Sequence, residues 1–240
     1  MRLQNEIIFP ATESSSFTGN SSSTNAAPID CDLIAPWYEP VEHLSFGSAL
    51  EARRCAFLPE LNDARRALSC GEGDGRFTAA LLQSNSRVKV TAVDASRKMV
   101  ELASQRVARM GDLCRRVEYH CSAIDGFRPP HPAYDLIATH FFLDCFTTED
   151  ASGVVRHIAD WAAPRARWVV SEFAQPSTPA AQLWTGAVIR SLYAAFRVTT
   201  GLRVTRLPDY RPALRSAGFT LQKEERALGG LLVSELWERE

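Results

Sequence analysis

Short hydrophobic runs alternate with amphipathic segments along the chain from about residue 66 onward. Runs rich in β-branched residues predict buried strands, whereas apolar positions spaced three and four apart predict helices. The predicted strands are 66–70, 88–94, 117–121, 135–139, 168–173, 219–226 and 231–237. The predicted helices are 77–83, 96–111, 151–163, 180–197 and 209–217.

The order of these elements predicts the fold class. Strands that alternate with helices of about 10–15 residues indicate βαβ units, which form a mostly parallel sheet covered by helices on both faces. The last two predicted strands are instead joined through Gly229-Gly230, which indicates a hairpin with an antiparallel strand near one edge. We therefore expect a doubly wound α/β domain that ends in an antiparallel hairpin.

The two ends of the chain differ in character. Residues 1–28 contain two serine runs and few apolar anchors, so they are predicted to be a disordered tail. Residues 29–60 carry apolar side chains at helical spacings and are predicted to form an N-terminal helical cap. Residues 61–240 then form the main domain, with an insertion at 176–206 before the hairpin.

Composition excludes several classes of partner. Hydrophobic residues make up 45% and charged residues 23%, as in ordinary globular proteins. The net charge of −1 favours neither nucleic acid nor an anionic membrane, and no apolar run approaches the roughly 18 residues of a membrane span. The six cysteines are scattered without the spacing of a metal site, which predicts reduced thiols, no bound metal and a cytoplasmic location.

A glycine-rich segment, Gly71-Glu72-Gly73-Asp74-Gly75, separates the first strand from its helix. Glycines let a ligand approach the backbone, because no Cβ is in the way and positive φ is allowed. The first N–H groups of the helix then face the ligand. Glycine runs also occur in plain tight turns, so this segment alone indicates a binding site only weakly.

Asp94, at the end of the second strand, strengthens the prediction of a nucleoside site. A carboxylate at this point can accept hydrogen bonds from both hydroxyls of an adenosine ribose. The alternative is an acid that complements the N-terminus of the next helix. Dinucleotide enzymes favour G-x-G-x-x-G, whereas this chain has G-x-G-x-G followed by Arg76. The compact spacing suits a ligand whose amino-acid end lies against the turn.

On these motifs the chain resembles the class I S-adenosylmethionine-dependent methyltransferases, in the small-molecule group that includes quinone-biosynthesis methyltransferases. The resemblance covers about residues 60–240. It rests on Gly71–Gly75, on Val93–Ser96 followed by Met99, and on the strand Tyr134–Thr139. It implies a seven-stranded sheet with an antiparallel seventh strand, and S-adenosylmethionine as cofactor.

The resemblance also implies which residues surround this cofactor. The methionine portion would contact Gly71, Gly73 and Gly75, the ribose Asp94, and the adenine Ala95, Met99, Ser122 and Ala123. The chain departs from the family at two points. The usual acid after the third strand is absent, with Asp125 slightly later, and Ser69 stands where the family has an acid. Glu72 is the candidate to provide the missing carboxylate for the cofactor's ammonium group.

The acceptor side is predicted after the fourth strand, in residues 140–146. Methyl transfer mainly requires alignment and exclusion of water, and a base only when the acceptor must lose a proton. His140 is the candidate base and also a cofactor contact, because imidazole titrates near neutrality. Asp144 could orient His140 or bind the acceptor. In the alternative interpretation, His140 only touches the cofactor and Asp144 caps the next helix.

Aromatic residues are frequent in the segments expected around the acceptor. They are Trp37, Tyr38, Phe141, Phe142, Trp184, Tyr193 and Tyr210. Such a lining suits a flat small molecule of apolar or cationic character, although most of these side chains could equally belong to the core. The helix at 180–197 is either a lid over the acceptor or a permanent part of the core, with membrane docking as a third alternative.

The sequence thus predicts an enzyme that transfers a methyl group from S-adenosylmethionine to a small-molecule acceptor. One alternative is an NAD(P)-dependent oxidoreductase, which should carry a Tyr-x-x-x-Lys pair or another hydride-transfer constellation that this chain lacks. The other is a non-catalytic subunit that binds an adenosyl ligand.

Overall fold

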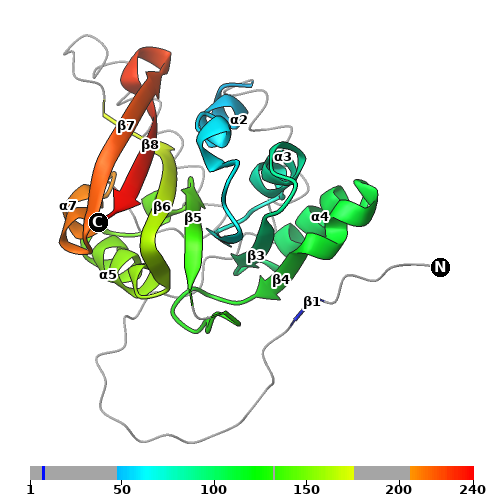
Figure 1. Cartoon of the computed structure of the whole chain (residues 1–240). Helices are drawn as coiled ribbons and strands as arrows, with labels where there is room; N and C mark the ends of the chain where they lie inside the picture. Colours follow the sequence, from blue (N-terminus) through cyan, green and yellow to red (C-terminus); the bar gives the residue numbers. More distant parts are fainter. Residues whose placement is uncertain (1–6, 9–47, 132, 176–205) are drawn as a thin grey trace, which may run out of the picture.

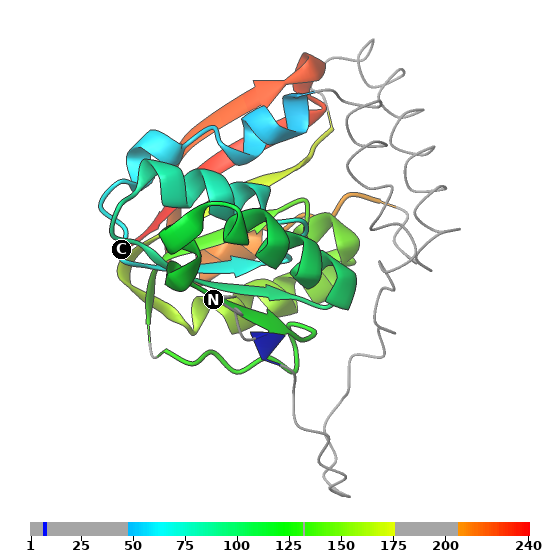
Figure 2. The ribbon, with the colours of Figure 1, turned by 90° about the vertical axis from the view of Figure 1, so that its right-hand side faces the viewer.

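The computed structural model describes residues 7–8, 48–131, 133–175 and 206–240, which form a sheet between two layers of helices (Figure 1, Figure 2). The strands are β1 (Ile7–Ile8), β2 (Arg66–Cys70), β3 (Lys89–Asp94), β4 (Val117–Cys121), β5 (Tyr134–His140), β6 (Ala162–Phe173), β7 (Phe219–Ala227) and β8 (Leu232–Arg239). The helices are α2 (Ala49–Arg54), α3 (Arg76–Ser84), α4 (Arg97–Ala108), α5 (Thr148–Ala159) and α7 (Arg211–Ser216). Short 3₁₀ helices are η1 (Leu58–Leu61), η2 (Gly111–Arg116), η3 (Leu143–Cys145) and η4 (Leu228–Gly230).

The strand order is β1-β4-β3-β2-β5-β6-β8-β7, and β8 alone among the described strands runs antiparallel to its neighbours. The predicted doubly wound sheet of seven strands, β2 to β8, with a C-terminal antiparallel strand is therefore confirmed. The chain leaves β2 toward β3 on one side and returns through β5 on the other. This reversal places a topological switch point at the carboxyl ends of β2 and β5, where ligands bind in open α/β sheets.

The core consists of two apolar layers, one on each face of the sheet. Helices α2, α3 and α4 cover one face, and α5 and α7 cover the other. Leu136 and Ile137 of β5 point to opposite layers and are both fully buried. Each such side chain stabilises the fold by roughly 1.5–3 kcal/mol. The central strands are thus rigidly held, and the residues at their carboxyl ends have fixed positions.

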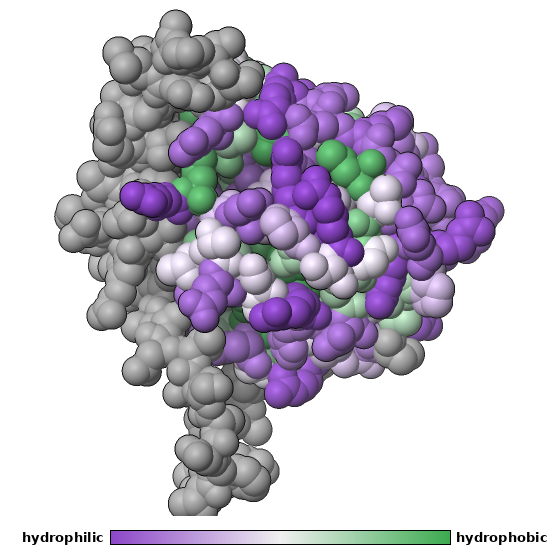
Figure 3. Space-filling model, turned by 90° about the vertical axis from the view of Figure 1, so that its left-hand side faces the viewer, coloured by the Kyte–Doolittle hydropathy of each residue, from purple (hydrophilic) through white to green (hydrophobic). Residues whose placement is uncertain are grey.

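The edge strand β7 is strongly polar. Residues 222–226 are exposed and charged or amidic, and Figure 3 shows hydrophilic residues predominating on this side of the molecule. Ion pairs join Arg53 to Glu225 and Lys223 to Glu60. Charged edge strands resist pairing with a second sheet, because the charges would have to be desolvated.

Some predicted boundaries were wrong. The helix predicted at 151–163 is α5, which begins at Thr148 because the Thr147 hydroxyl accepts a hydrogen bond from the Asp150 N–H, at 3.2 Å. Strand β6 begins at Ala162, which pairs with Tyr134 of β5, and not at residue 168. The predicted helix 96–111 ends at Ala108. Strand pairing and helix capping determine where these elements begin and end, and neither can be predicted from the spacing of hydrophobic residues.

The predicted tail and insertion are described only in small part. Ile7 and Ile8 of the segment 1–28 pair in parallel with Tyr119 and His120 of β4, which the sequence did not predict. The rest of this segment lies outside the described residues, as do residues 29–47 of the predicted cap and the predicted helix 180–197.

Candidate functional site

The glycine turn lies at the switch point, between β2 and α3. Gly71, Gly73 and Gly75 have φ angles of 66°, 62° and 85°, in the left-handed region that favours glycine. A Cβ on Gly75 would lie 2.7 Å from Ala103 Cα, so the start of α3 packs directly on α4. A Cβ on Gly73 would meet no atom of the described residues within 4 Å. The turn is therefore close-packed at its helix end and open in its middle.

Asp94 joins this turn to the start of α4. Its Oδ2 accepts a hydrogen bond from the Gly73 N–H at 2.8 Å, and its Oδ1 accepts one from the Ser96 N–H at 2.8 Å. Ser96 also caps α4, since its hydroxyl accepts from the Met99 N–H at 3.2 Å. The structure thus brings together the glycine turn and the acid at the end of the second central strand, two features that the sequence predicted to share one site.

The residues predicted beside the adenine follow β3 and β4. The Ser122 N–H donates to the Asp94 carbonyl at 2.9 Å, so the chain after β4 runs next to Asp94. Ala95 and Ala123 are exposed, whereas Met99 is buried. Asp125, the nearest acid to the family's missing one, is exposed and its carboxylate accepts from the Gly126 N–H.

Glu72 has a buried carboxyl group within the glycine turn. Burial raises its pKa to about 7, opposed by hydrogen bonds from Ser69 and Thr78. Its Oε2 is buried and has no hydrogen-bond partner among the described residues. The carboxyl group therefore lies beside Ser69, the position at which the family has its acid.

The protonation of His140 follows from its neighbours. The hydroxyls of Ser171 and Ser234 lie 2.9 and 2.8 Å from the Arg53 carbonyl oxygen, which can only accept, so both hydroxyls donate to it. Ser171 then offers only lone pairs to the His140 Nδ1, 3.0 Å away. Nδ1 must carry the hydrogen, and Nε2 carries the free lone pair.

The same surroundings make His140 a weak base. Its ring packs against Phe77, with centroids 4.4 Å apart, and its Nε2 is buried without a described partner. Burial, together with the nearby charge of Arg54, lowers the pKa of His140 to about 3. The imidazole is therefore neutral at physiological pH. It is suited to accepting a hydrogen bond at Nε2 and poorly suited to holding a proton.

Asp144 lies in η3, next to a carboxyl group that the sequence did not single out. Its side chain is buried, which raises its pKa to about 6, opposed by hydrogen bonds from Cys145 and Glu172. The predicted alternative role as cap of the following helix was wrong, because α5 is capped by Thr147. A buried carboxylate with a pKa near neutrality is suited to receiving a proton.

Glu172, at the end of β6, holds the segment that contains Asp144. Its Oε1 accepts from the N–H groups of Phe142 and Leu143 at 3.1 and 2.8 Å, and its Oε2 accepts from the Asp144 N–H at 3.3 Å. One sequence signal was available, since Glu172 ends a buried strand as Asp94 does. That its partners are backbone groups after β5 could not be read from the sequence.

The aromatic residues after β5 have distinct positions. Phe141 has a φ of 53°, a strained conformation for a non-glycine residue, and the Arg54 guanidinium lies 5.1 Å from its ring centroid. Phe142 packs on Gly71 so closely that a Cβ there would lie 2.3 Å from the ring. Tyr210 is buried in the layer under α5 and α7. Trp37, Tyr38, Trp184 and Tyr193 lie outside the described residues.

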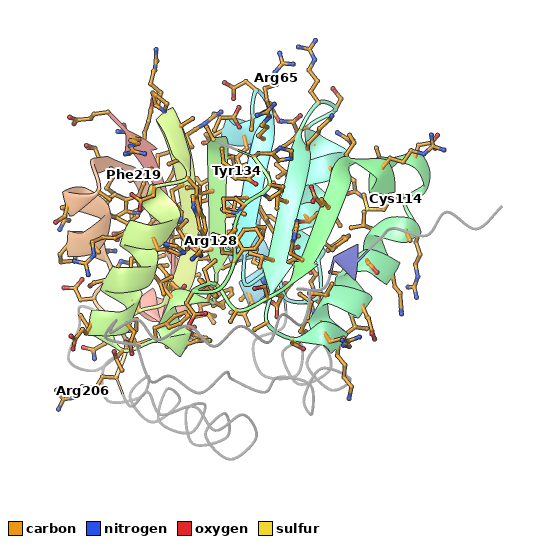
Figure 4. The ribbon with its side chains drawn as sticks, turned by 90° about the horizontal axis from the view of Figure 1, so that it is seen from below. Arg65, Cys114, Arg128, Tyr134, Arg206 and Phe219 are labelled. Atoms are coloured by element: carbon orange, nitrogen blue, oxygen red, sulfur yellow. The ribbon has the colours of Figure 1, made fainter. Side chains whose placement is uncertain are left out.

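Figure 4 shows the orientation of the sheet. Arg65 lies at the amino ends of the central strands, and Arg206 lies at the opposite end of the molecule. The glycine turn follows β2, and Asp94 and His140 are the last residues of β3 and β5. Within the described ranges, no helix is long and apolar enough to cross a membrane.

Asp144 gives the fold a testable pH dependence. Because its pKa is raised in the folded state from 3.8 to about 6, the folded protein binds more protons than the unfolded chain between these values, and stability falls as pH rises through them. Asp144→Asn removes this loss. We expect its melting temperature relative to wild type to increase from pH 4.5 to pH 7.5. A difference that stays constant with pH, as expected for the exposed control Asp112→Asn, would contradict this environment for Asp144.

Comparisons with known proteins agree with this architecture. Residues 68–168 match a family model described as a methyltransferase domain. No curated protein matches the sequence. The structure of mitomycin 7-O-methyltransferase MmcR superposes with a TM-score of 0.63 at 18% identity, over 85% of this chain and 57% of MmcR. The structure of magnesium protoporphyrin IX methyltransferase ChlM from Synechocystis PCC 6803, with bound SAH, superposes with a TM-score of 0.61 at 19% identity. The match covers 85% of this chain and 88% of ChlM.

A third solved structure is an O-methyltransferase family 2 protein from Planctomyces limnophilus DSM 3776 in complex with apigenin. It gives a TM-score of 0.63 at 18% identity, over 86% of this chain and 62% of that protein. The chain thus spans about three fifths of this enzyme and of MmcR. Residues 68–168 thus match a methyltransferase-domain family, and the chain shares its fold with solved methyltransferases, in agreement with the predicted class.

Proposed function

We propose that this chain transfers a methyl group from S-adenosylmethionine to a small-molecule acceptor. The observation that carries the proposal is the joining of Asp94 to the open glycine turn through the Gly73 N–H. The methyltransferase family match supports the reaction class and argues against hydride transfer. When bound, S-adenosylmethionine supplies an electrophilic methyl group on a sulfonium.

The residues present fit this cofactor. The open middle of the turn at Gly73 leaves room for the methionine portion next to the backbone. The unpartnered Oε2 of Glu72 is a carboxylate oxygen suited to an ammonium group. Asp94 is the candidate partner of the ribose hydroxyls, because hydrogen bonds from Gly73 and Ser96 hold its carboxylate beside the glycine turn. Gly71 and Gly75 shape the turn.

Ala95, Met99, Ser122 and Ala123 are proposed to surround the adenine. Support for this group comes from the hydrogen bond that brings the chain at Ser122 beside Asp94. The buried Met99 would contribute mainly by fixing the start of α4, whereas the exposed Ala95 and Ala123 offer surface to the base.

Glu72 predicts how cofactor affinity depends on pH. An ammonium group favours the ionised carboxylate, so below pH 7 binding must release the proton from Glu72. We expect the affinity for S-adenosylhomocysteine to fall by up to about tenfold per pH unit below pH 7. Calorimetry in buffers of different ionisation enthalpy measures the released proton directly. Glu72→Gln should abolish both effects, and a wild-type affinity independent of pH from 5.5 to 8 would contradict this role.

On the acceptor side we assign the proton-accepting role to Asp144 and a hydrogen-bonding role to His140. Asp144 has a pKa of about 6, close enough to neutrality to receive a proton from an acceptor group. His140 stays neutral and presents the Nε2 lone pair, so it is proposed to contact cofactor or acceptor without taking a proton.

The acceptor is proposed to be a small, flat molecule. Phe142 packs on Gly71 of the glycine turn, and Phe141 contacts the Arg54 guanidinium and the ring of Phe173. Aromatic walls favour planar or apolar groups. The solved structures named above include one protein in complex with apigenin and one named for magnesium protoporphyrin IX, and both molecules are planar.

Transfer of labelled methyl groups tests this function. The full chain is incubated with methyl-labelled S-adenosylmethionine and a panel of phenols, carboxylic acids and amines, and the products are identified by mass spectrometry. We expect labelled product from wild type and a severe loss in Asp94→Ala. Tight cofactor binding with no product from any acceptor would favour the non-catalytic adenosyl-binding subunit instead.

A cytoplasmic location is proposed on the cysteines. All five described cysteines, at positions 55, 70, 114, 121 and 145, are free thiols. Free thiols persist in reducing compartments, whereas oxidising compartments favour disulfides.

A further inference from the structure

Glu172 is a buried acid at a place where a strand would ordinarily end in an apolar residue. It is 1% exposed, and three consecutive backbone N–H groups, of Phe142, Leu143 and Asp144, donate to its two oxygens. The charge of Asp144 acts on Glu172, and the charges of Glu172 and Glu235 both act on Tyr210. Burying a carboxyl group among acids costs free energy, so its retention needs a compensating role.

The three N–H groups explain that role in part. They lie at the start of η3, where the first N–H groups of a helical turn have no hydrogen-bond partner within the turn. The preceding residue, Phe141, has a left-handed φ of 53°, so the chain turns sharply out of β5. An unpaired buried N–H costs about 1–3 kcal/mol. The post-β5 loop, residues 141–145, therefore depends on an acceptor supplied from the neighbouring strand.

The loop in turn reaches the cofactor turn. Phe142, whose N–H is held by Glu172, packs its ring on Gly71. Asp144, also held by Glu172, shares a side-chain hydrogen bond with it. Glu172 therefore fixes the backbone of Asp144 together with that of Phe142.

We propose that Glu172 is a positioning residue of the methyl-transfer site, which holds the post-β5 loop so that Phe142 lies on the glycine turn and Asp144 faces the acceptor. The effect of Glu172 on methyl transfer rests on the proposed function. The loop geometry itself rests only on the hydrogen bonds of Glu172. Glu172 touches neither reactant in this role and acts through the residues that it holds.

The test compares three variants of the full chain. Glu172→Leu keeps the side-chain volume but removes the acceptor, and Glu172→Gln keeps one carbonyl oxygen. Glu235→Gln is the matched control, because Glu235 is equally buried on the neighbouring strand β8 but bonds to Trp237 and Arg211 and not to the loop. Amide hydrogen exchange of residues 142–144, melting temperature and affinity for S-adenosylhomocysteine are measured for each.

We expect Glu172→Leu to speed exchange at 142–144 and to weaken S-adenosylhomocysteine binding by about tenfold, through loss of an ordered loop. Its melting temperature should fall, because the N–H groups of residues 142–144 lose their buried acceptor. Glu172→Gln should recover most of the affinity. Glu235→Gln should leave exchange at 142–144 and affinity unchanged.

Two outcomes overturn the inference. Unchanged exchange and affinity in Glu172→Leu would show that the loop keeps its conformation without Glu172. Changes in Glu235→Gln as large as those in Glu172→Leu would show that both buried acids affect only the stability of the fold. If wild type fails to bind S-adenosylhomocysteine, the proposed function fails instead, while hydrogen exchange still decides whether Glu172 orders the loop. If Glu172→Leu does not fold, Glu172→Gln is compared with Glu235→Gln instead. Faster exchange at 142–144 and weaker binding in Glu172→Gln alone support the inference, and equal values in the two variants overturn it.

Discussion

Replacing Asp94 with alanine is expected to remove most of the affinity for S-adenosylhomocysteine. The carboxylate would accept hydrogen bonds from two ribose hydroxyls, and each such charge-assisted hydrogen bond contributes roughly 1.5–3 kcal/mol. Losing both weakens binding by about a hundredfold or more. The turn itself also loosens, because the Gly73 and Ser96 N–H groups lose their acceptor. Isothermal titration measures the affinity.

The matched control is Asp112→Ala, which removes an exposed acid from η2 without touching the turn. It should bind S-adenosylhomocysteine like wild type. Asp94→Asn should fall between the two, since the amide keeps one acceptor oxygen. A change in affinity of less than threefold in Asp94→Ala, with the fold intact, would reduce Asp94 to an acid at the start of a helix.

Replacing Gly75 with alanine is expected to destabilise the fold more than the same change at Gly73. A φ of 85° costs a non-glycine residue roughly 1–2 kcal/mol, and the new Cβ would lie 2.7 Å from the Ala103 Cα, which cannot move without shifting α4. Overpacking of this kind adds about 1–3 kcal/mol. For a chain of this size, the melting temperature should fall by about 10 °C. Differential scanning calorimetry measures it.

Gly73→Ala is the matched control, because it places a Cβ in open space at a φ of 62°. It retains the backbone strain and lacks the contact with α4, so we expect a fall of only about 3–5 °C. Equal losses in the two variants would show that backbone conformation alone explains the glycines, without close packing of α3 on α4.

The sequence predicted the features that arise from local pattern. Strands β2 and β3 are short apolar runs, and the turn between β2 and α3 is recognisable because only glycine adopts its φ angles readily. Asp94 could be placed beside this turn because the carboxyl ends of parallel strands meet at one edge. The alternation of strands and helices then determined the doubly wound sheet.

Features that depend on distant contacts were missed. Glu172 binds backbone groups about thirty positions earlier, and this pairing depends on the register between β5 and β6, which no local pattern records. The low pKa of His140 was also missed, because it is caused by burial and by the charge of Arg54, a residue of α2. The start of β6 at Ala162 followed from its pairing with Tyr134. Sequence thus located the site, while tertiary packing set its electrostatics.

Calorimetric titration of the purified chain with S-adenosylhomocysteine, in parallel with NAD and NADP, tests the central claim most directly. The account predicts micromolar binding of S-adenosylhomocysteine, about −8 kcal/mol, at one site, and no heat from either dinucleotide. Binding of NAD or NADP, or no binding of S-adenosylhomocysteine at millimolar concentration, would contradict it.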